Sequence, residues 1–433
     1  MSIKLVLKWS ITSVKSHNRP KGHDGNTMKR HKLTWLLAAC VASLMAVACG
    51  GNEPAYGTPP EAPVVPPGFV PGAGIAPPRF AYVVHTNDDS VSGYTVDPVD
   101  GTLTTMAAGT PWLTGSSPTS IAVDPLVKFA YVSNSGSNNL SIFSISDPSG
   151  ILTSAAVPVA TGNQPRSVVV DPQGRYVYVA NYGSNTISAF TRSTVTGLLT
   201  PITGSPFAMP SSSDIAPRSV AVDPSGKFVY VANYGATSSP STISMFTIDT
   251  ASTGSLVPGA LTGVGSIAAG SHPNQITVSP SGRQVYVSNE TGDSIMVYDV
   301  ANTTTGSLAY KGFVSTPGST PTGVAIEPNN KYAYTSNRSN NTIGAYSIAQ
   351  GGGSQGLLTA ITGGGTTVTT PTNPGPTSMA TDPSGKFVYS TLLAGGGVAA
   401  YKITSSTGAL TMVTNSPFND GGATQSDFIV ITK

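Results

Sequence analysis

The sequence predicts an all-β protein folded as a seven-bladed β-propeller whose blades are four-stranded antiparallel sheets. One phrase, seen at residues 217–233, recurs seven times along the chain, and the last residues form a strand that nothing follows. Successive copies of the tyrosine in this phrase are 49, 47, 52, 56, 48 and 55 residues apart. A period of this length is typical of repeat architectures. The seven tyrosines are Tyr82, Tyr131, Tyr178, Tyr230, Tyr286, Tyr334 and Tyr389.

Each repeat divides into short strands separated by turn residues. In the fourth copy, Val220–Val222 and Phe228–Ala232 are alternating runs on either side of the turn Asp-Pro-Ser-Gly at 223–226. Proline presets φ in such a turn, the aspartate caps nearby backbone and the glycine accepts a positive φ. Thr242–Ile248 then predicts a third strand, and Gly254–Val257 begins a fourth. Because no helical periodicity follows residue 49, each repeat is interpreted as one blade.

The two ends of the repeat region predict a closed ring. The first copy begins at Arg79–Tyr82, which corresponds to a second strand, so its innermost strand is missing. The chain finishes with Ser426–Thr432, a strand without a successor. Pairing this strand into the first blade closes the ring and removes two exposed sheet edges.

The residues before the repeats predict export and lipid anchoring. A basic segment starting at Met28, an uncharged stretch from Leu33 to Ala48 and small residues around Cys49 indicate a signal peptide. The stretch is shorter than the roughly 20 residues of a membrane span. Residues 46–50 resemble a bacterial lipobox, in which Cys49 is lipidated. The segment ending at Cys40 matches that box more literally but leaves a very short apolar core, and an ordinary cleaved signal is the other alternative.

Three regions are therefore expected. Residues 1–48 form a leader whose true start is Met28, residues 49–78 form the lipidated cysteine and a linker with nine prolines, and residues 79–433 form the propeller. A proline-rich linker is semi-rigid and extended. We expect a protein of the bacterial cell envelope, anchored through Cys49 to a membrane that faces the periplasm or the cell surface.

Composition limits the partners and cofactors. Removing residues 1–48 leaves 14 of the 22 Lys and Arg and 19 of the 20 Asp and Glu, a net charge of −5 without a basic run. We therefore expect no nucleic-acid partner. Both cysteines precede residue 50, so no internal disulfide is expected in the mature chain. His85 and His272 are the only histidines after the leader, which argues against a multi-histidine metal site. We expect a monomer without a cofactor.

Strand direction predicts which face carries a ligand site. In a four-stranded antiparallel blade, the loop after the second strand and the link before the next innermost strand lie on the same face. Asparagines expected to end the second strands cap turns there, so we interpret them as structural. They are Asn87, Asn134, Asn181, Asn233, Asn289 and Asn337, with Thr391 breaking the series.

Four charged residues break the repeat pattern on that face. Glu290 and Arg338 each follow an asparagine of the series, while Arg166 and Arg218 follow the prolines that open the third and fourth copies. In a chain with only 10% charged residues, this convergence on the central channel predicts a site for an anionic or carbonyl-bearing ligand. His272 and Asn274 are further candidate ligand-binding residues. The alternative is a solvated rim with ion pairs worth about 0–1 kcal/mol each.

These residues carry a resemblance to two overlapping families. Phrases such as Tyr178-Val179-Ala180-Asn181 resemble the YVTN-type propeller repeat, and the whole of 79–433 resembles the seven-bladed lactonase family of 6-phosphogluconolactonases and carboxymuconate-lactonising enzymes. The Asn-Glu motif at 289–290 and the Ser-Asn-Arg motif at 336–338 match that family. The sequence departs from it at 217–219, Pro-Arg-Ser in place of Pro-His-His, and at 273–275, Pro-Asn-Gln in place of Pro-Arg-His.

Three hypotheses follow. Because two motifs are lost, the first is a cell-envelope module that binds a small ligand or an envelope protein. The second is a lactone hydrolase acting on a sugar or dicarboxylate lactone. There the resemblance implies Glu290 as general base, with Arg338 and Arg218 holding an oxyanion or a substrate carboxylate. The third is a structural surface-coat component.

Overall fold

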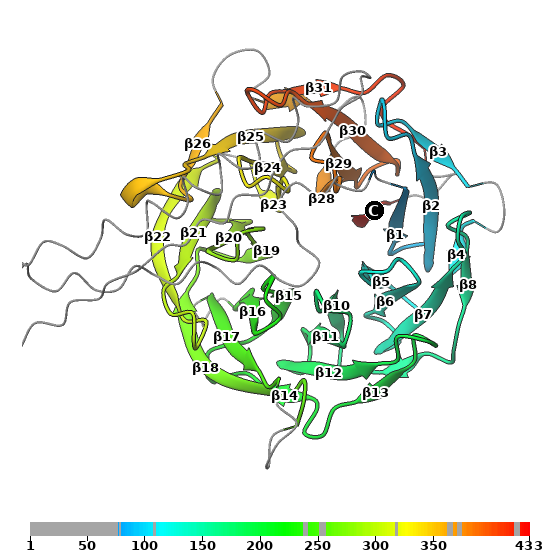
Figure 1. Ribbon diagram of the computed structural model, residues 1–433, viewed down its shortest axis with the longest axis vertical. Coiled ribbons are helices and arrows are strands. Elements are labelled where there is room, and N and C mark those ends of the chain that lie inside the picture. The colour runs from blue at the N-terminus through cyan, green and yellow to red at the C-terminus, as the bar shows by residue number, and fades with distance from the viewer. Residues whose placement is uncertain are drawn as a thin grey trace, which may run out of the picture. The chain divides into compact units, whose positions relative to one another are not determined.

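Seven antiparallel sheets follow one another around a central axis, as the ribbon in Figure 1 shows. The structure is a computed structural model. It describes residues 77, 79–106, 110–236, 241–250, 257–316, 319–361, 367–369, 375–419 and 425–433, all within the compact unit Val64–Lys433. The predicted leader, Cys49 and most of the linker lie outside these residues. Within them, no helix is long and apolar enough to cross a membrane.

The three inner strands of blades two to seven are alike in length. The innermost strands are β5 (Pro118–Val123), β10 (Pro165–Val170), β15 (Pro217–Val222), β19 (Pro273–Val278), β23 (Pro321–Ile326) and β28 (Pro376–Thr381). The second strands are β6 (Phe129–Asn134), β11 (Tyr176–Asn181), β16 (Phe228–Asn233), β20 (Gln284–Asn289), β24 (Tyr332–Asn337) and β29 (Phe387–Leu392). The third strands are β7 (Asn139–Ile145), β12 (Thr186–Arg192), β17 (Thr242–Ile248), β21 (Ser294–Val300), β25 (Thr342–Ile348) and β30 (Val398–Ile403).

The outermost strands differ more between blades. They are β8 (Leu152–Ser154), β13 (Leu199–Pro201), β18 (Leu261–Ala268), β22 (Leu308–Ser315), β26 (Leu358–Ala360) and β31 (Leu410–Met412). Short strands β9 (Val159–Ala160), β14 (Phe207–Ala208) and β27 (Thr367–Thr369) pair with the third strands of blades two, three and six. A 3-10 turn, η1 (Gly352–Ser354), precedes β26.

Blade one confirms the predicted closure of the ring. It contains β1 (Phe80–His85), β2 (Ser90–Val96), β3 (Leu103–Thr105) and β4 (Trp112–Leu113), and its innermost strand is the C-terminal β32 (Phe428–Ile431). β32 pairs antiparallel with β1, with Val430 opposite Tyr82. The sequence prediction of seven four-stranded blades closed by the last strand is therefore confirmed.

The expected start of the fourth strand at Gly254–Val257 lies outside the described residues except for Val257, which is not in a strand. The described strand β18 begins at Leu261. Val257 accepts a hydrogen bond from the Ala260 amide at 2.9 Å. Gly259 has φ +87°, and its amide donates to Asp249 at 2.7 Å. Pro258 has no amide hydrogen for a sheet ladder. Residues 257–260 are consequently a turn before the strand.

The asparagines at the ends of the second strands are structural, as predicted. Nδ2 of the Asn233 side chain donates to Ser244 Oγ at 2.7 Å, and Nδ2 of Asn134 donates to Ser141 Oγ at 2.9 Å. In both blades this hydrogen bond joins the second strand to the third. The register corrects two members of the series. His85, not Asn87, lies opposite the start of the third strand in blade one, and its Nε2 is 2.8 Å from Ser92 Oγ.

The second correction concerns blade seven. Leu392, not Thr391, occupies the asparagine position there, because Leu392 pairs with Pro376 as Asn134 pairs with Pro118. Thr391 is one residue earlier and takes the place of Ser133. A leucine cannot donate the cross-strand hydrogen bond, so blade seven lacks it.

A circle of hydrogen bonds joins each blade to the next. In every copy the repeat tyrosine is buried and its hydroxyl donates to a glycine carbonyl in the loop before the outermost strand of the following blade. Tyr389 of blade seven donates to Gly101 of blade one at 3.0 Å and closes the circle. The other pairs are Tyr82–Gly150, Tyr131–Gly197, Tyr178–Gly259, Tyr230–Gly306, Tyr286–Gly356 and Tyr334–Gly408, at 2.6–3.1 Å.

Apolar side chains fill the spaces between neighbouring blades. Tyr82 and Val84 of blade one share a buried cluster with Val132 of blade two. On the other side of the closure, Val83 of blade one shares a cluster with Tyr389 of blade seven. Because a strand sends alternate side chains to opposite faces, one strand supplies both interfaces of its blade. Burial raises the pKa of Tyr131 to about 12, so its hydroxyl remains a donor at neutral pH.

Gly197→Ala tests this circle. Gly197 has φ +72°, and a Cβ there would collide with the ring of Phe129 in the preceding blade. We expect the substitution to lower the free energy of unfolding by about 2 kcal/mol, from backbone strain and overpacking together. Gly351→Ala is the matched control, because Gly351 has φ −165° and a Cβ there meets nothing within 4 Å. Equal urea midpoints for the two variants would contradict the assigned role.

Candidate functional site

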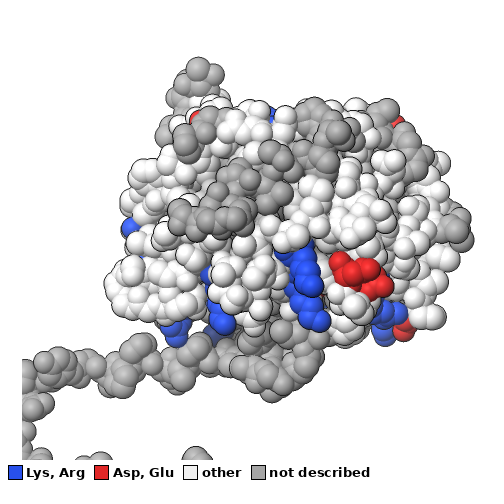
Figure 2. All heavy atoms as spheres, turned by 90° about the horizontal axis from the view of Figure 1, so that it is seen from above, with Lys and Arg blue, Asp and Glu red and all other residues white. Residues whose placement is uncertain are grey.

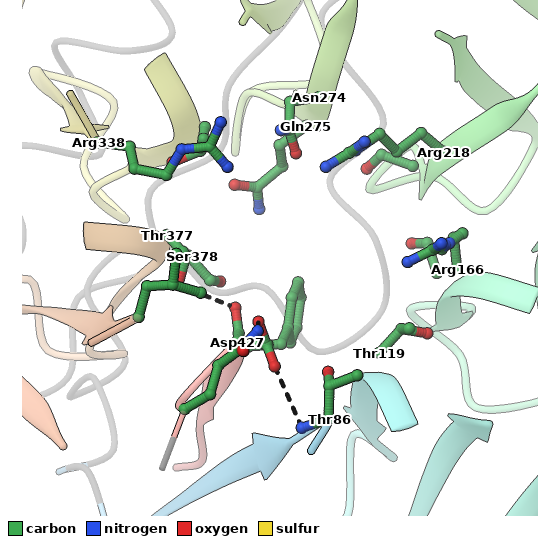
Figure 3. A pocket seen from close by; sticks show the side chains of 16 residues that line it. Thr86, Thr119, Arg166, Arg218, Asn274, Gln275, Arg338, Thr377, Ser378 and Asp427 are labelled. Carbon is green, nitrogen blue, oxygen red and sulfur yellow. Dashed lines mark hydrogen bonds between the residues drawn. The ribbon is translucent and has the colours of Figure 1, made fainter. Parts of the chain in front are cut away.

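A cavity of about 410 Å³ lies at the centre of the ring on the face that the strand directions predicted. Polar side chains from all seven blades line it, and Figure 3 shows several of them pointing toward its middle. On the side of the molecule that Figure 2 shows, most of the described residues are uncharged, with a few blue and red groups among them. The lining residues are Thr86, Thr119, Arg166, Ser167, Arg218, Ser219, Asn274, Gln275, Thr322, Arg338, Thr377, Ser378, Leu393, Gln425, Asp427 and Phe428.

In blades two to seven, a β-bulge at the start of the innermost strand directs one side chain into the cavity. In β15, Pro217 pairs with Asn233 and Ser219 with Ala232, so Arg218 between them is the extra residue. The same shift leaves Arg166 unpaired in β10. A bulge releases a residue from the ladder and re-aims its side chain. The corresponding residues of blades two, five, six and seven are Thr119, Asn274, Thr322 and Thr377.

Blade one supplies Asp427 at this same position. Thr119 Oγ1 donates to the carbonyl of Pro165 in the next blade at 3.0 Å, and Thr377 Oγ1 donates to the carbonyl of Ser426 at 3.1 Å. Ser426 thus stands where the other blades have a strand-opening proline, and Asp427 follows it. The sequence analysis missed Asp427. Aligning the closing strand with the six innermost strands that open with a proline would have found it.

Glu290 joins residues from three blades but does not line the cavity. Its Oε1 accepts a hydrogen bond from Nη2 of Arg338. Its Oε2 accepts one from Asn274 Nδ2 at 3.0 Å and lies 3.9 Å from Nη2 of Arg218. The Glu290 side chain is 10% exposed, against 32% for Arg218 and 34% for Arg338. The carboxylate therefore lies behind the two guanidinium groups and holds them at the cavity wall.

Aromatic rings support two of the arginines. The Arg218 guanidinium lies 4.8 Å from the ring centre of Tyr234, and that of Arg166 lies 5.5 Å from the ring centre of Tyr182. In the part of the chain that the structure describes, no carboxylate lies within ion-pair distance of Arg166. Partial burial and then the neighbouring charge of Arg218 lower the pKa of Arg166. An anion in the cavity would offset both effects.

Among the predicted site residues, the structure brings Arg166, Arg218, Asn274 and Arg338 together around the cavity. His272 is not among the lining residues. Its ring packs on Tyr234 at 4.5 Å, and its Nδ1 lies 2.6 Å from Thr291 Oγ1. His272 has φ +54° immediately before the strand-opening proline. Other blades have the same backbone conformation at this point, in Ser117, Gln164, Ala216 and Thr320.

Comparisons with known proteins agree with this architecture. The family model described as "Lactonase, 7-bladed beta-propeller" matches residues 69–216, 260–359 and 321–424. A protein from Bacteroides uniformis, described as a proposed 6-phosphogluconolactonase, has a TM-score of 0.66 at 20% identity, over 82% of this chain and 100% of its own. No curated protein is similar enough in sequence to match.

A second solved structure is the periplasmic gluconolactonase of Pseudomonas aeruginosa. It has a TM-score of 0.65 at 16% identity, over 83% of this chain and 99% of its own. At these identities the two solved structures establish similarity of fold.

Arg166→Gln tests whether the cavity binds anions. Inorganic phosphate at a hundred times its dissociation constant should stabilise the unsubstituted chain by about 2.7 kcal/mol, because it binds only the folded state. This stabilisation by phosphate should be smaller in Arg166→Gln. Phosphate also stabilises proteins without binding them, so Arg283→Gln is the control: Arg283 is exposed in the turn between β19 and β20. Equal thermal shifts in the two variants would argue against an anion site.

Proposed function

The chain belongs to the seven-bladed β-propeller lactonase family, and from this premise we propose that it hydrolyses a sugar lactone in the axial cavity. The observation that carries the proposal is the convergence of Arg218 and Arg338 on one wall of a largely polar cavity, with Glu290 fixing both. Opening a lactone places negative charge on its carbonyl oxygen. Cations held beforehand at that point lower the barrier.

The lining favours a sugar lactone over an apolar one. Hydroxyl and amide groups from all seven blades face the cavity, including Ser167, Ser219, Gln275 and Thr322, and they match the hydroxyl groups of a sugar. Leu393 and Phe428 are the large apolar residues among the described lining. The third arginine, Arg166, supports a substrate that carries a carboxylate or another anionic group away from the reacting carbonyl.

Family membership favours this function over the ligand-binding module that the loss of two motifs suggested. The missing histidines are the main argument for a module. Arg218 and Asn274 occupy two of the altered positions, and both contact Glu290. In this chain the altered motifs therefore extend the polar network around the carboxylate. The two hypotheses differ in one outcome: a binding module would bind its ligand without hydrolysing it, whereas a hydrolase would open the lactone.

Arg338→Gln tests the hydrolase function. The full-length chain should open glucono-δ-lactone faster than the uncatalysed background, measured as acid release with a pH indicator. Loss of one oxyanion donor should lower kcat by about 10²–10³. Arg283→Gln, on the opposite face, should leave kcat unchanged. Binding of the lactone without turnover, across a panel of sugar and dicarboxylate lactones, would favour the binding module instead.

We also propose that the chain is exported and anchored through a lipid on Cys49. The basic start at Met28, the apolar stretch 33–48 and the small residues around Cys49 support this. A lipidated cysteine in such a segment would hold the propeller at a membrane through the proline-rich linker.

Cys49→Ser tests the anchor in a bacterial host. The unsubstituted chain should sediment with membranes and incorporate labelled palmitate, whereas Cys49→Ser should do neither. Cys40→Ser is the matched control and should behave like the unsubstituted chain. Loss of the label in Cys40→Ser alone would move the lipid site to Cys40.

A further inference from the structure

We propose that Asp427, carried by the ring-closing strand, is the general base of this hydrolase, and that Glu290 positions the arginines. The inference rests on the proposed function. It concerns the residue that removes the proton from the attacking water. Lactone hydrolysis by water needs such a group within hydrogen-bond reach of the water.

Asp427 is the acidic side chain among the described residues that line the cavity, and no histidine is among them. In Figure 3 it lies across the cavity from Arg218 and Arg338. The two sides suit opposite roles. Guanidinium groups remain protonated and do not accept a proton, so they serve the oxygen that becomes negative. The carboxylate on the facing wall is free to accept one.

Two uncharged hydrogen-bond donors hold the Asp427 carboxylate in place and leave it able to accept a proton. Its Oδ2 accepts a hydrogen bond from the Thr86 amide at 3.1 Å, and its Oδ1 accepts one from Gln425 Nε2 at 2.6 Å. Each carboxylate oxygen has two lone pairs, so each retains one for a water. Within the described part of the chain, no Lys or Arg lies within ion-pair distance of Asp427.

The backbone of Asp427 is held as firmly as its side chain. The Asp427 amide donates to the Val84 carbonyl at 2.9 Å, and the Asp427 carbonyl accepts from Thr377 Oγ1 at 3.2 Å. These contacts come from blades one and seven, the two blades that the closing strand joins. A base fixed on both sides presents one geometry to the substrate.

Glu290 has the opposite environment. Arg338 and Asn274 occupy its two oxygens, and Arg218 adds a second positive charge at 3.9 Å. Accepting a proton from water would require breaking at least one of these contacts. The arginines would then lose the partner that holds them at the wall. Glu290 is therefore a positioning residue rather than the base.

The reaction balances with water as the only co-reactant. Asp427 accepts a proton as the water oxygen bonds to the lactone carbonyl carbon, and the carbonyl π pair moves onto its oxygen beside the guanidinium groups. The electron pair on this oxygen then re-forms the carbonyl double bond, and the bond between the carbonyl carbon and the ring oxygen breaks. The ring oxygen takes the proton from Asp427. The products are the hydroxy acid and the original carboxylate.

Asp427→Asn in the full-length chain tests the assignment. We expect kcat for glucono-δ-lactone to fall by about 10²–10⁴, with KM within a factor of about three, because the amide keeps the shape but cannot accept the proton. Glu290→Gln should lower kcat by a smaller factor, because the substituted amide oxygen still accepts a hydrogen bond from Arg338 and both arginines keep their charge. Asp89→Asn is the matched control: Asp89 also accepts a backbone amide hydrogen bond on this face, from Ser117 at 2.7 Å, but does not line the cavity.

Two further measurements separate a catalytic role from a structural one. Gluconate should bind Asp427→Asn with the affinity of the unsubstituted chain by calorimetry, which shows that the site is intact. Formate should restore part of the turnover to Asp427→Ala and none to Glu290→Ala. If Asp427→Asn keeps kcat while Glu290→Gln loses it, Glu290 is the base and the inference is overturned. If the unsubstituted chain opens no lactone, the proposed function itself fails.

Discussion

The hydrogen bond from each repeat tyrosine to a glycine carbonyl of the next blade is the constraint on which the rest of the structure depends. It sets the distance and angle between neighbouring blades, and it does so in the same way seven times. In blade seven, Tyr389 donates to Gly101 of blade one, so the geometry is satisfied only when the ring closes. These tyrosines are fully buried. Removal of one would leave a carbonyl without its partner, at a cost of about 1–3 kcal/mol.

This repeated geometry brings six bulge positions, and the equivalent position in blade one, to one axis, and the chemistry of the site comes from the residues at these positions. Threonines at three positions tie the innermost strands together, as when Thr322 donates to Pro376 at 3.1 Å. Arginines at two others, together with Arg338 from a second-strand loop, face the cavity as cations. Asp427 occupies the position in the blade that the closing strand completes. The functional residues in this fold are thus those that differ between blades at equivalent backbone positions. The pairing of β32 with β1, which completes blade one, also brings this carboxylate opposite the arginines.

Much of the fold and the location of the site could be predicted from the sequence, because a repeat of this length is typical of one propeller blade. The strands, the closing strand and the face of the site all followed from the recurring phrase and from strand direction. Other features depend on register, which periodicity does not resolve. His85 replaces an asparagine two residues before the position that sequence comparison chose. Asp427 was overlooked because the closing strand lacks the proline that marks its counterparts. That Glu290 lies behind Arg338 rather than in the cavity follows only from the packing of three blades.

A crystal structure of the full-length chain with a gluconolactam, which resembles the lactone but resists hydrolysis, tests the central claim most directly. The account predicts the lactam in the axial cavity, with its carbonyl oxygen within hydrogen-bond distance of Arg338 or Arg218. It also predicts a water between Asp427 and the carbonyl carbon. A lactam bound outside the cavity would contradict the account. So would a carbonyl oxygen turned away from the arginines with no water at Asp427.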